Sequence, residues 1–534
     1  MDTAIYNPLE EYEKKLKPLH FENTKKLFEK LTKESGVDVD ANKETVKQYN
    51  IYTERLSDVK KKLRWRKFFR VLMWISVLLI PVAILKLNPQ IKELKDEVNF
   101  ADQKASEFLA LANEQMKPLV ALFKEWDSIT LIEETMPLLK FMPQFTVEQE
   151  SNMKINYDFN SDVDVEQSTL DVLSGEYNEN PFVFENRLVH RMGTETYYGY
   201  KTISWTETYR DSNGKMQTRR RTERLQASVT KPKPFYHTEV VLNYGAQAAP
   251  DLCFFRDATN LHNKSEKAIE RYIKRGEKRL DRKASRALKK GDDFTSMANS
   301  DFEVLFDALD RTDEVQFRTL FTPLAQTNMV DLILSKTGYG DDFNFMKTKR
   351  MNTISSVHSQ NRNLVLPTYS FTSHSFEIIE QNFLLQNAEY FKAIYFDLAP
   401  VLAIPAYQER PVHSLKPIPD YSQLYSLKES ETLANLVNEK DIVHPDTKTE
   451  AILKSSYIST ENGVDKTTVT AYSYDIEKRV DIVSVRGGDG HWHNVSVPWD
   501  EYIPLEHITN FGVTQTNKAV SALATRNGLC IFKL

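Results

Sequence analysis

The chain has 534 residues, of which 41% are hydrophobic, 11% aromatic and 27% charged. This composition can build a sizeable core and excludes a wholly disordered chain. Seventy Lys and Arg residues against 75 Asp and Glu residues give a net charge of −5, which excludes a globally basic nucleic-acid-binding protein. Two cysteines, Cys253 and Cys530, exclude a disulfide-rich scaffold and a structural zinc site made of cysteines alone.

The first 67 residues are predicted to be a helical hairpin. Residues 10–33 and 43–66 are rich in Lys, Glu and Leu, and a break at residues 36–40 separates them.

An apolar stretch follows at residues 71–85, VLMWISVLLIPVAIL, which carries no charge. With Phe68, Phe69 and Leu87 it is long enough to predict one transmembrane helix over residues 68–87. Basic residues crowd the preceding flank, whereas acids offset the lysines that follow. The positive-inside rule therefore places residues 1–67 in the cytoplasm and the large domain outside a cell membrane, as a single-pass protein. The alternative is a buried helix of a soluble domain.

Residues 88–140 are predicted to form a helical stalk, because apolar residues recur there at a spacing of three and four. The members of this seam are Ile91, Leu94, Val98, Ala101, Ala105, Phe108 and Ala112. The seam would pair with a second copy in a coiled coil, giving a homo-oligomer, or would fold back on its own domain.

Residues 141–534 are predicted to form one α+β domain. Residues 197–210 and 215–230 flank Asn213-Gly214, which is typical of a β-hairpin. Further strands are expected at residues 235–244, 467–474, 479–485 and 491–497. Helices are expected at residues 265–290, 300–309, 324–335 and 429–438. Strands with intervening helices indicate the α+β class, with one long helix inserted between β-rich segments.

The inserted helix, residues 264–290, holds twelve Lys or Arg residues and four acids. An apolar stripe of Ile269, Ile273, Leu280, Ala284, Ala287 and Leu288 makes it a basic amphipathic helix. We expect its cations to bind an anionic surface, either anionic lipid or an acidic protein partner; nucleic acid is the less favoured ligand. The predicted binding residues are Lys264, Lys267, Arg271, Lys274, Arg275, Lys278, Arg279, Arg282, Lys283 and Arg286. The alternative is a solvated helix that covers a core face.

Two smaller clusters are weaker candidates. Arg219-Arg220-Arg221 and Arg224 follow the hairpin turn, and strand alternation places Arg219 and Arg221 on one face and Arg220 and Arg224 on the other. Arginine forks bind phosphate or carboxylate, but no aromatic stacking platform is interleaved with these arginines, so an exposed charged hairpin is the favoured interpretation. His491 and His493 would make an incomplete metal site, so a histidine pair without metal is favoured.

The sequence lacks the common catalytic and nucleotide-binding motifs. It contains no Gly-x-Ser-x-Gly elbow, phosphate-binding Gly-x4-Gly-Lys-Ser/Thr loop, His-Glu-x-x-His pair or dinucleotide-binding glycine pattern. Asp341-Asp342 lacks the other ligands of a calcium loop, and Cys253 lies in an apolar run typical of an inert thiol. No cofactor, metal or catalytic residue is therefore predicted, and an enzyme is not the favoured class.

Three segments, residues 321–329 (FTPLAQTNM), 395–400 (YFDLAP) and 470–474 (TAYSY), resemble uncharacterised membrane-anchored proteins of low-GC Gram-positive bacteria and mollicutes. The similarity runs from about Tyr197 onward. It implies a bacterial envelope protein with one anchored domain, and it implies no activity, cofactor or site residue.

The favoured hypothesis is a membrane-anchored interaction or scaffold protein of the bacterial envelope. One alternative is an envelope hydrolase or transferase with a site assembled in the α+β domain. Another is the inverted topology, with a cytoplasmic domain that binds nucleic acid.

Overall fold

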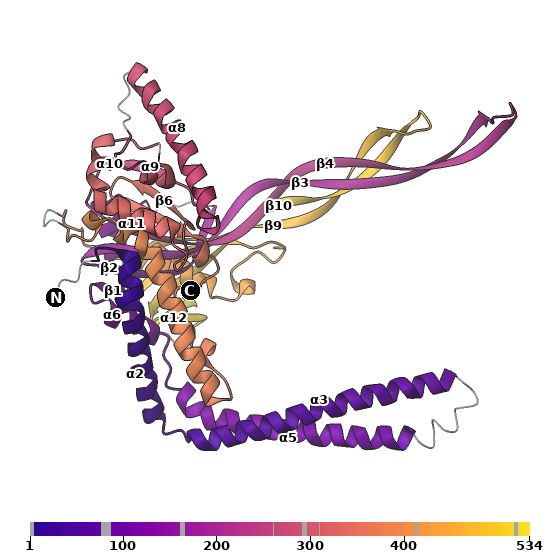
Figure 1. Ribbon diagram of the computed structural model, residues 1–534, viewed down its shortest axis with the longest axis horizontal. Helices are drawn as coiled ribbons and strands as arrows, with labels where there is room; N and C mark the ends of the chain where they lie inside the picture. Colours follow the sequence, from indigo (N-terminus) through magenta and orange to yellow (C-terminus); the bar gives the residue numbers. More distant parts are fainter. Residues whose placement is uncertain are drawn as a thin grey trace. The chain divides into compact units, whose positions relative to one another are not determined.

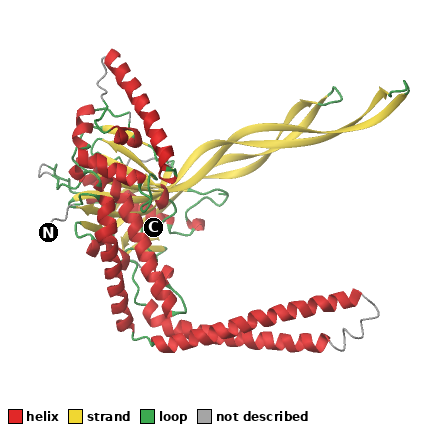
Figure 2. Cartoon of the chain, in the orientation of Figure 1, coloured by secondary structure: helices red, strands yellow, loops and turns green. Residues whose placement is uncertain are grey.

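The computed structural model describes residues 5–75, 87–160, 166–259, 261–290, 296–308, 310–411, 415–516 and 522–534. The chain is α+β, with two antiparallel sheets and helices that are largely separate from them in sequence (Figures 1 and 2). It divides into two compact units. Unit 1 comprises Met1–Leu9, Leu138–Leu364 and Phe396–Leu534, and unit 2 comprises Glu10–Pro137 and Val365–Tyr395.

Unit 1 contains a seven-stranded sheet in the order β1-β2-β3-β4-β7-β6-β5. Its strands are β1 Leu139–Met142, β2 Gln167–Tyr177, β3 Asn180–Arg210, β4 Met216–Gly245, β5 Cys253–Arg256, β6 Phe343–Thr348 and β7 Met351–Ser356. At the β5–β6 edge, Phe254 and Phe345 pack against phenylalanines of nearby helices, among them Phe306 and Phe317. These rings form an aromatic core under the helices that follow β5.

The helices of unit 1 are mostly short. They are α1 Pro8–Glu11, which continues into unit 2, α7 Val147–Tyr157, α8 Glu266–Lys290, α9 Ser300–Phe306, α10 Glu314–Leu320, α11 Pro323–Leu334 and α13 Leu427–Asn435, with single turns at Leu261–Asn263, Val357–Ser359, Pro405–Tyr407 and Glu439–Asp441. Helix α12, Phe376–Leu402, begins in unit 2 and ends in unit 1. Side chains of Asn299, Asp313 and Thr322 cap α9, α10 and α11 by accepting hydrogen bonds from backbone N–H groups, which fixes where these helices begin.

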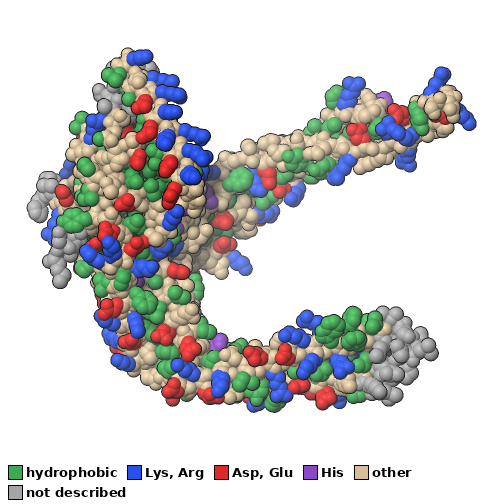
Figure 3. Space-filling view, viewed as in Figure 1, with side chains coloured by type: hydrophobic (Ala, Val, Ile, Leu, Met, Phe, Trp, Pro, Cys, Tyr) green, Lys and Arg blue, Asp and Glu red, His purple; other side chains and the backbone are tan. Residues whose placement is uncertain are grey.

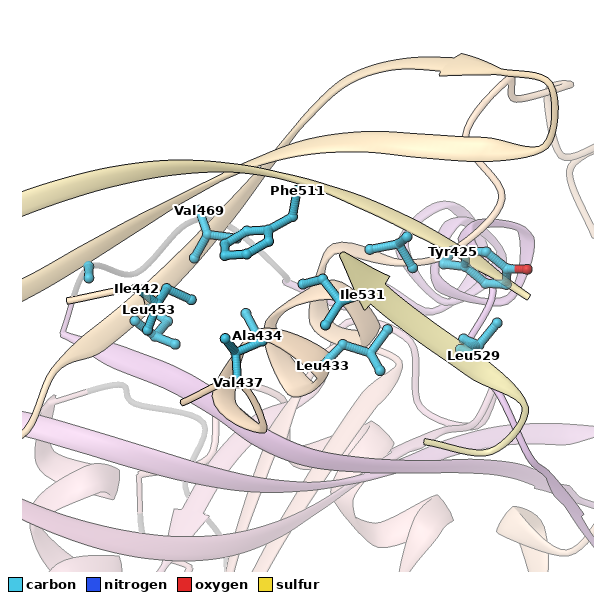
Figure 4. Packing of buried hydrophobic residues seen from close by; sticks show 12 residues of the cluster. Tyr425, Leu433, Ala434, Val437, Ile442, Leu453, Val469, Phe511, Leu529 and Ile531 are labelled. Atoms are coloured by element: carbon cyan, nitrogen blue, oxygen red, sulfur yellow. The ribbon is translucent and has the colours of Figure 1, made fainter. Parts of the chain in front are cut away.

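A second, five-stranded sheet of unit 1 has the order β11-β12-β10-β9-β8. Its strands are β8 Ile452–Glu461, β9 Val464–Arg486, β10 Trp492–Gln515, β11 Ala524–Arg526 and β12 Leu529–Lys533. Helix α13 covers this sheet, and Figure 4 shows Leu433 and Ala434 of α13 among Val469, Phe511 and Ile531. Helix α13 also contacts the first sheet through Asn435, whose side chain donates to Thr169.

Two strand pairs of unit 1 extend well beyond their sheets. Beyond Val189, where pairing with β2 ends, β3 and β4 continue as a two-stranded ribbon to the turn at residues 211–215. The 31 residues of β3 span about 100 Å at the usual rise per residue. Strands β9 and β10 form a second ribbon, which runs beside the first (Figure 1). We call these the β3–β4 ribbon and the β9–β10 ribbon.

The two ribbons pack face to face. Ile203 and Leu225 of the β3–β4 ribbon form a buried cluster with Val495 and Val497 of the β9–β10 ribbon. Salt bridges and hydrogen bonds fix the alignment, including Lys231 Nζ to Asp481 Oδ2 at 2.7 Å. Around this cluster each ribbon therefore has one face covered by the other ribbon and one face directed to solvent, whereas near the turn of the β3–β4 ribbon both faces are exposed, as at Tyr209, Arg219 and Arg221.

Several predicted strands belong to longer ones. The strand expected at residues 235–244 is the end of β4, and the strands expected at 467–474 and 479–485 are both β9. The predicted division of β4 before residue 235 is wrong, because β4 continues through Pro232 and Pro234 although proline cannot donate a ladder hydrogen bond. Both prolines lie where β4 pairs with β3 alone. Within the described residues, the other edge of β4 has no partner strand there, so it needs no backbone N–H donor.

Unit 2 is helical. Its elements are a turn at Tyr12–Leu16, α2 Lys17–Ser35, α3 Val39–Ile75, α5 Asn88–Val120, α6 Asp127–Thr135, a turn at Thr368–Phe371 and the first part of α12. The predicted break lies at Gly36, whose φ of 64° ends α2. Phe28, Met116, Phe123 and Phe383 contribute to its core.

Helices α3 and α5 are antiparallel, and this overturns the predicted transmembrane helix at residues 68–87. Leu63 of α3 packs in one cluster with Leu87 and Ile91, while Asn42, near the start of α3, bonds Gln115, near the end of α5.

Within the described residues, no helix is long and apolar enough to cross a membrane. Residues 68–75 continue α3, and residues 76–86 of the predicted span lie outside the described part. The prediction of a single-pass cell-membrane protein with its large domain outside is therefore contradicted as well.

The predicted stalk, residues 88–140, comprises α5, α6 and β1 rather than one helix. Its seam faces α3: Ile91, Ala101, Ala105 and Ala112 are buried, and Phe108 stacks on Tyr52 of α3. The seam thus packs on α3 of the N-terminal helical segment, and not on the large α+β domain as the alternative to pairing with a second copy had it.

Candidate functional site

Helix α8 carries nine of the ten cationic side chains that the sequence singled out, and Lys264 lies two residues before its first residue, Glu266. Its inner face is built around Gly276, where a Cβ atom would lie 2.3 Å from Cγ1 of Val304 in α9. Leu280 and Ala287, on the same side, are 3% and 4% exposed. The glycine that interrupts the predicted stripe is therefore the point at which α9 crosses α8. Leu288 is the exception to the predicted stripe, because it is 84% exposed.

The charges of α8 are sorted around the helix. At 100° per residue, its lysines and arginines lie within an arc of about 180° that is centred opposite the buried stripe. Its four acids, Glu266, Glu270, Glu277 and Asp281, lie in an arc of about 60° that overlaps one side of the stripe and lies outside the cationic arc. The outward face of α8 therefore carries cations alone, and Figure 3 shows a row of Lys and Arg side chains along the helix.

Nine of the ten predicted binding residues are exposed. Arg279 is exposed and pairs with Asp307, with 2.8 Å between Nη2 and Oδ1. The other eight exposed residues form no ion pair with the described part of the chain: Lys264, Lys267, Arg271, Lys274, Arg275, Lys278, Arg282 and Arg286. We call these eight residues the α8 cationic face.

Lys283 is the one predicted residue that does not fit the surface. It is half-buried, and burial, together with the nearby positive charge of Arg311, lowers the pKa of its ammonium group. Its position at the edge of the cationic arc points it toward α9–α10, where Arg311 is buried between Glu303 and Glu314.

The arginines of the hairpin follow the predicted alternation. The register pairs Arg219 with Glu207 and Arg221 with Trp205, which places both arginines on the inner face of the β3–β4 ribbon. Both lie near Glu207, and Arg221 Nε donates to its carboxylate at 2.7 Å. Arg220 and Arg224 lie on the opposite, outer face, and the Arg224 guanidinium lies 3.9 Å from the ring centroid of Tyr200.

The histidine pair near residue 491 does not assemble a metal site. His493 Nε2 lies 2.9 Å from Asp489 Oδ2, whereas the candidate neighbour Asp500 pairs with Lys478. His507 contacts the ring of His444 instead. No group of three His, Cys, Asp or Glu side chains that could hold a metal ion occurs among the residues the structure describes.

The two aspartates near residue 341 are both paired. Asp341 accepts from the fully buried Arg256, and Asp342 Oδ2 lies 2.6 Å from His358 Nδ1. They therefore hold the fold together rather than presenting oxygen atoms to a cation.

A buried cluster around His358 brings a serine beside a histidine. The Ser359 hydroxyl donates to Asp397 at 2.7 Å, and Arg362 donates to the same carboxylate at 2.6 Å. The serine is thus bonded to Asp397 and not to His358. The adjoining cavity has a volume of about 10 Å³, too small for a substrate. Sequence spacing could not reveal this cluster, because α12 supplies Asp397 from a distant segment.

A larger cavity of about 400 Å³ lies between α13, β8 and the first sheet. Its lining includes Glu439 and Glu450, but no histidine, cysteine or serine is found among the described residues that line it. Two carboxylates in one cavity are a feature that the hydrolase alternative needs, but both glutamates are exposed rather than desolvated inside the cavity. The α8 cationic face remains the most sharply defined candidate site.

Comparison with known proteins gives this chain no relatives: no family model, curated protein or solved structure matches it. The resemblance to membrane-anchored proteins of Gram-positive bacteria and mollicutes thus stays a prediction.

Proposed function

We propose that this chain is an interaction or scaffold protein without catalytic activity, which docks on an anionic lipid surface through the α8 cationic face. The observation that carries this proposal is the sorting of charge on α8. Seven exposed cations of α8, unpaired within the described part of the chain, lie on one acid-free face and Lys264 precedes them, while the opposite face is buried against α9. A helix that merely covered a core would need no such separation of acids from bases.

Simple electrostatics supports a contact with lipid headgroups. The 25 residues of α8 extend for about 37 Å, so the face offers a straight row of cations to a flat surface. Each Lys or Arg near an anionic bilayer contributes about 1 kcal/mol. Lipid headgroups can rearrange under such a row, whereas an acidic protein would need carboxylates at matching positions.

The direction of the apolar stripe favours binding of α8 at the membrane surface rather than insertion into the bilayer. Ile269, Ile273 and Leu280 are turned toward the domain, so α8 would rest on the headgroups and bury little hydrocarbon. Binding should therefore depend strongly on salt, because screening weakens exposed charges and leaves hydrophobic contacts largely unaffected.

The test is sedimentation of the full chain with vesicles of phosphatidylcholine, with or without phosphatidylserine. At about 50 mM salt we expect binding to the anionic vesicles alone, weakened at least tenfold at about 300 mM. Equal binding to both vesicles would refute the proposal. Binding to polyglutamate but to neither vesicle would identify an acidic protein as the ligand and would also refute it.

A further inference from the structure

We propose that the outer face of the β3–β4 ribbon is a separate binding site for single-stranded nucleic acid. This face consists of the even-numbered residues from Thr196 to Arg210 of β3 and from Met216 to Thr230 of β4, which the register pairs with one another. All sixteen are exposed. We call this surface the outer ribbon face.

The composition of the outer ribbon face is strongly biased. It holds seven threonines, two serines, two tyrosines, three arginines, one methionine and one glutamine, and no acid. The two acids of these strand segments, Glu207 and Glu223, lie at odd-numbered positions, on the face that packs on the β9–β10 ribbon. Ordinary surface strands carry both acids and bases on one face. The absence of acids beside the three arginines of this face therefore favours an anionic ligand.

Hydroxyl and guanidinium groups are the usual side-chain partners of phosphate oxygens in nucleic-acid complexes. Along each strand, residues of one face recur every two positions, at about 6.6 Å. This repeat is close to the distance between successive phosphates of an extended single strand. The face runs for about 50 Å, which leaves room for several nucleotides.

Aromatic rings are interleaved with these donors. Tyr198 and Tyr200 are 51% and 50% exposed, and Arg224 lies over the Tyr200 ring. Exposed rings beside a cationic track are the elements with which proteins stack the bases of single strands without sequence preference. The unpaired bases of a single strand can reach them, whereas the bases of a duplex are stacked on one another.

Other ligand classes fit this face less well. An anionic bilayer attracts a dense row of cations, whereas three of the sixteen residues of this face are cationic and the hydroxyls and tyrosines add little to that attraction. An acidic peptide would need few hydroxyls and would gain nothing from the tyrosines. The sequence alone suggested an exposed charged hairpin here, because the pairing of Thr202 with Arg224 and of Thr206 with Arg220 appears only in the register.

The test uses the full chain and a fluorescent oligothymidylate of about 20 nucleotides, followed by anisotropy. Two double variants remove the same charge from the same strand on opposite faces: R220Q/R224Q on the outer face and R219Q/R221Q on the inner face. We expect R220Q/R224Q to weaken binding at least tenfold and to reduce the salt dependence by about 1.4 in log K against log salt. We expect R219Q/R221Q to remain within twofold of the unchanged chain.

Additional variants test the roles of the tyrosines and of the α8 cationic face in this binding. Tyr198→Ala should weaken binding at least fivefold, because a stacking platform is lost. Retained binding after neutralisation of the α8 cationic face would support the proposal. Any one of three results would overturn it: no saturable binding at about 50 mM salt, equal losses in both double variants, or equal affinity for a duplex of the same length.

Discussion

Gly199 of β3 lies against the backbone of Ser496 in β10, so closely that a Cβ atom at position 199 would come within 2.2 Å of the Ser496 carbonyl oxygen. This contact lies beside the cluster of Ile203, Ala227 and Val497, where the two ribbons pack. The close approach requires glycine, because backbone atoms cannot move aside as a flexible side chain can.

Gly199→Ala should therefore separate the two ribbons locally, at a cost of about 1–3 kcal/mol. Hydrogen exchange should quicken at the amides around residues 199–205 and 494–498. The control is Ser204→Ala, on the exposed face of the same strand. If the two variants exchange alike, the ribbons are not held together at this contact.

At Gly276 the close contact with α9 predicts a stability change opposite in sign to the one that helix propensity predicts. Alanine in a helix interior is more favourable than glycine by about 1 kcal/mol, yet Gly276→Ala should destabilise unit 1, because the new methyl group would overlap Val304. The double variant G276A/V304A makes room for that group and should recover much of the loss in chemical denaturation. A stabilising effect of Gly276→Ala alone would contradict the close contact of α8 with α9.

His20 should make unit 2 sensitive to acid. Burial lowers the pKa of His20 from 6.5 to about 4, and its Nε2 donates to the Asn387 carbonyl oxygen at 3.2 Å. Between pH 6.5 and 4 the unfolded chain binds a proton that the folded chain does not. The free energy of unfolding should therefore fall by ~3 kcal/mol as the pH drops through this window.

The His20→Gln variant tests this by removing the titrating group. Denaturant unfolding at several pH values should show a shallower loss of stability for His20→Gln than for the unchanged chain between pH 6.5 and 4. The same pH dependence in both proteins would exclude His20 as the source of acid sensitivity.

Arg526 should be essential to unit 1. Its guanidinium lies 2.6 Å from both Glu429 of α13 and Asp171 of β2, and burial raises the pKa of each carboxyl group. Arg526→Met would leave two acids buried without a cation and should cost about 3–5 kcal/mol at neutral pH.

The deficit of Arg526→Met should shrink as the pH falls from 7.5 to 5. The stranded acids have pKa values raised above those of the unfolded chain, so protonation restores part of the lost stability. Arg410→Met, in an exposed pair with Glu179, is the control and should cost less than about 1 kcal/mol. Equal losses for the two variants would show that the buried network does not stabilise the sheet.

The sequence predicted those elements whose signals are local. The turn at Asn213-Gly214 and the stripe of α8 depend on neighbours along the chain, and both lie where the patterns indicated. Helix α12 was missed because it is buried on several sides, so its residues from Phe383 to Leu402 show no amphipathic period.

Features that depend on distant segments could not be predicted in this way. The span expected at residues 68–87 came from hydropathy alone, and the packing of Leu63 on Leu87 is a tertiary contact that hydropathy does not describe. The outer ribbon face could likewise not be predicted, because the sequence does not show which threonines of β3 lie beside which arginines of β4.

Two quadruple variants test whether the α8 cationic face binds an anionic lipid surface. The variant R271Q/R275Q/K278Q/R282Q removes four charges from that face, and K25Q/K33Q/K336Q/K440Q removes four exposed charges elsewhere. Binding to phosphatidylserine vesicles at about 50 mM salt should fall at least tenfold in the first variant and less than twofold in the second. Equal affinities of the two variants would contradict the account.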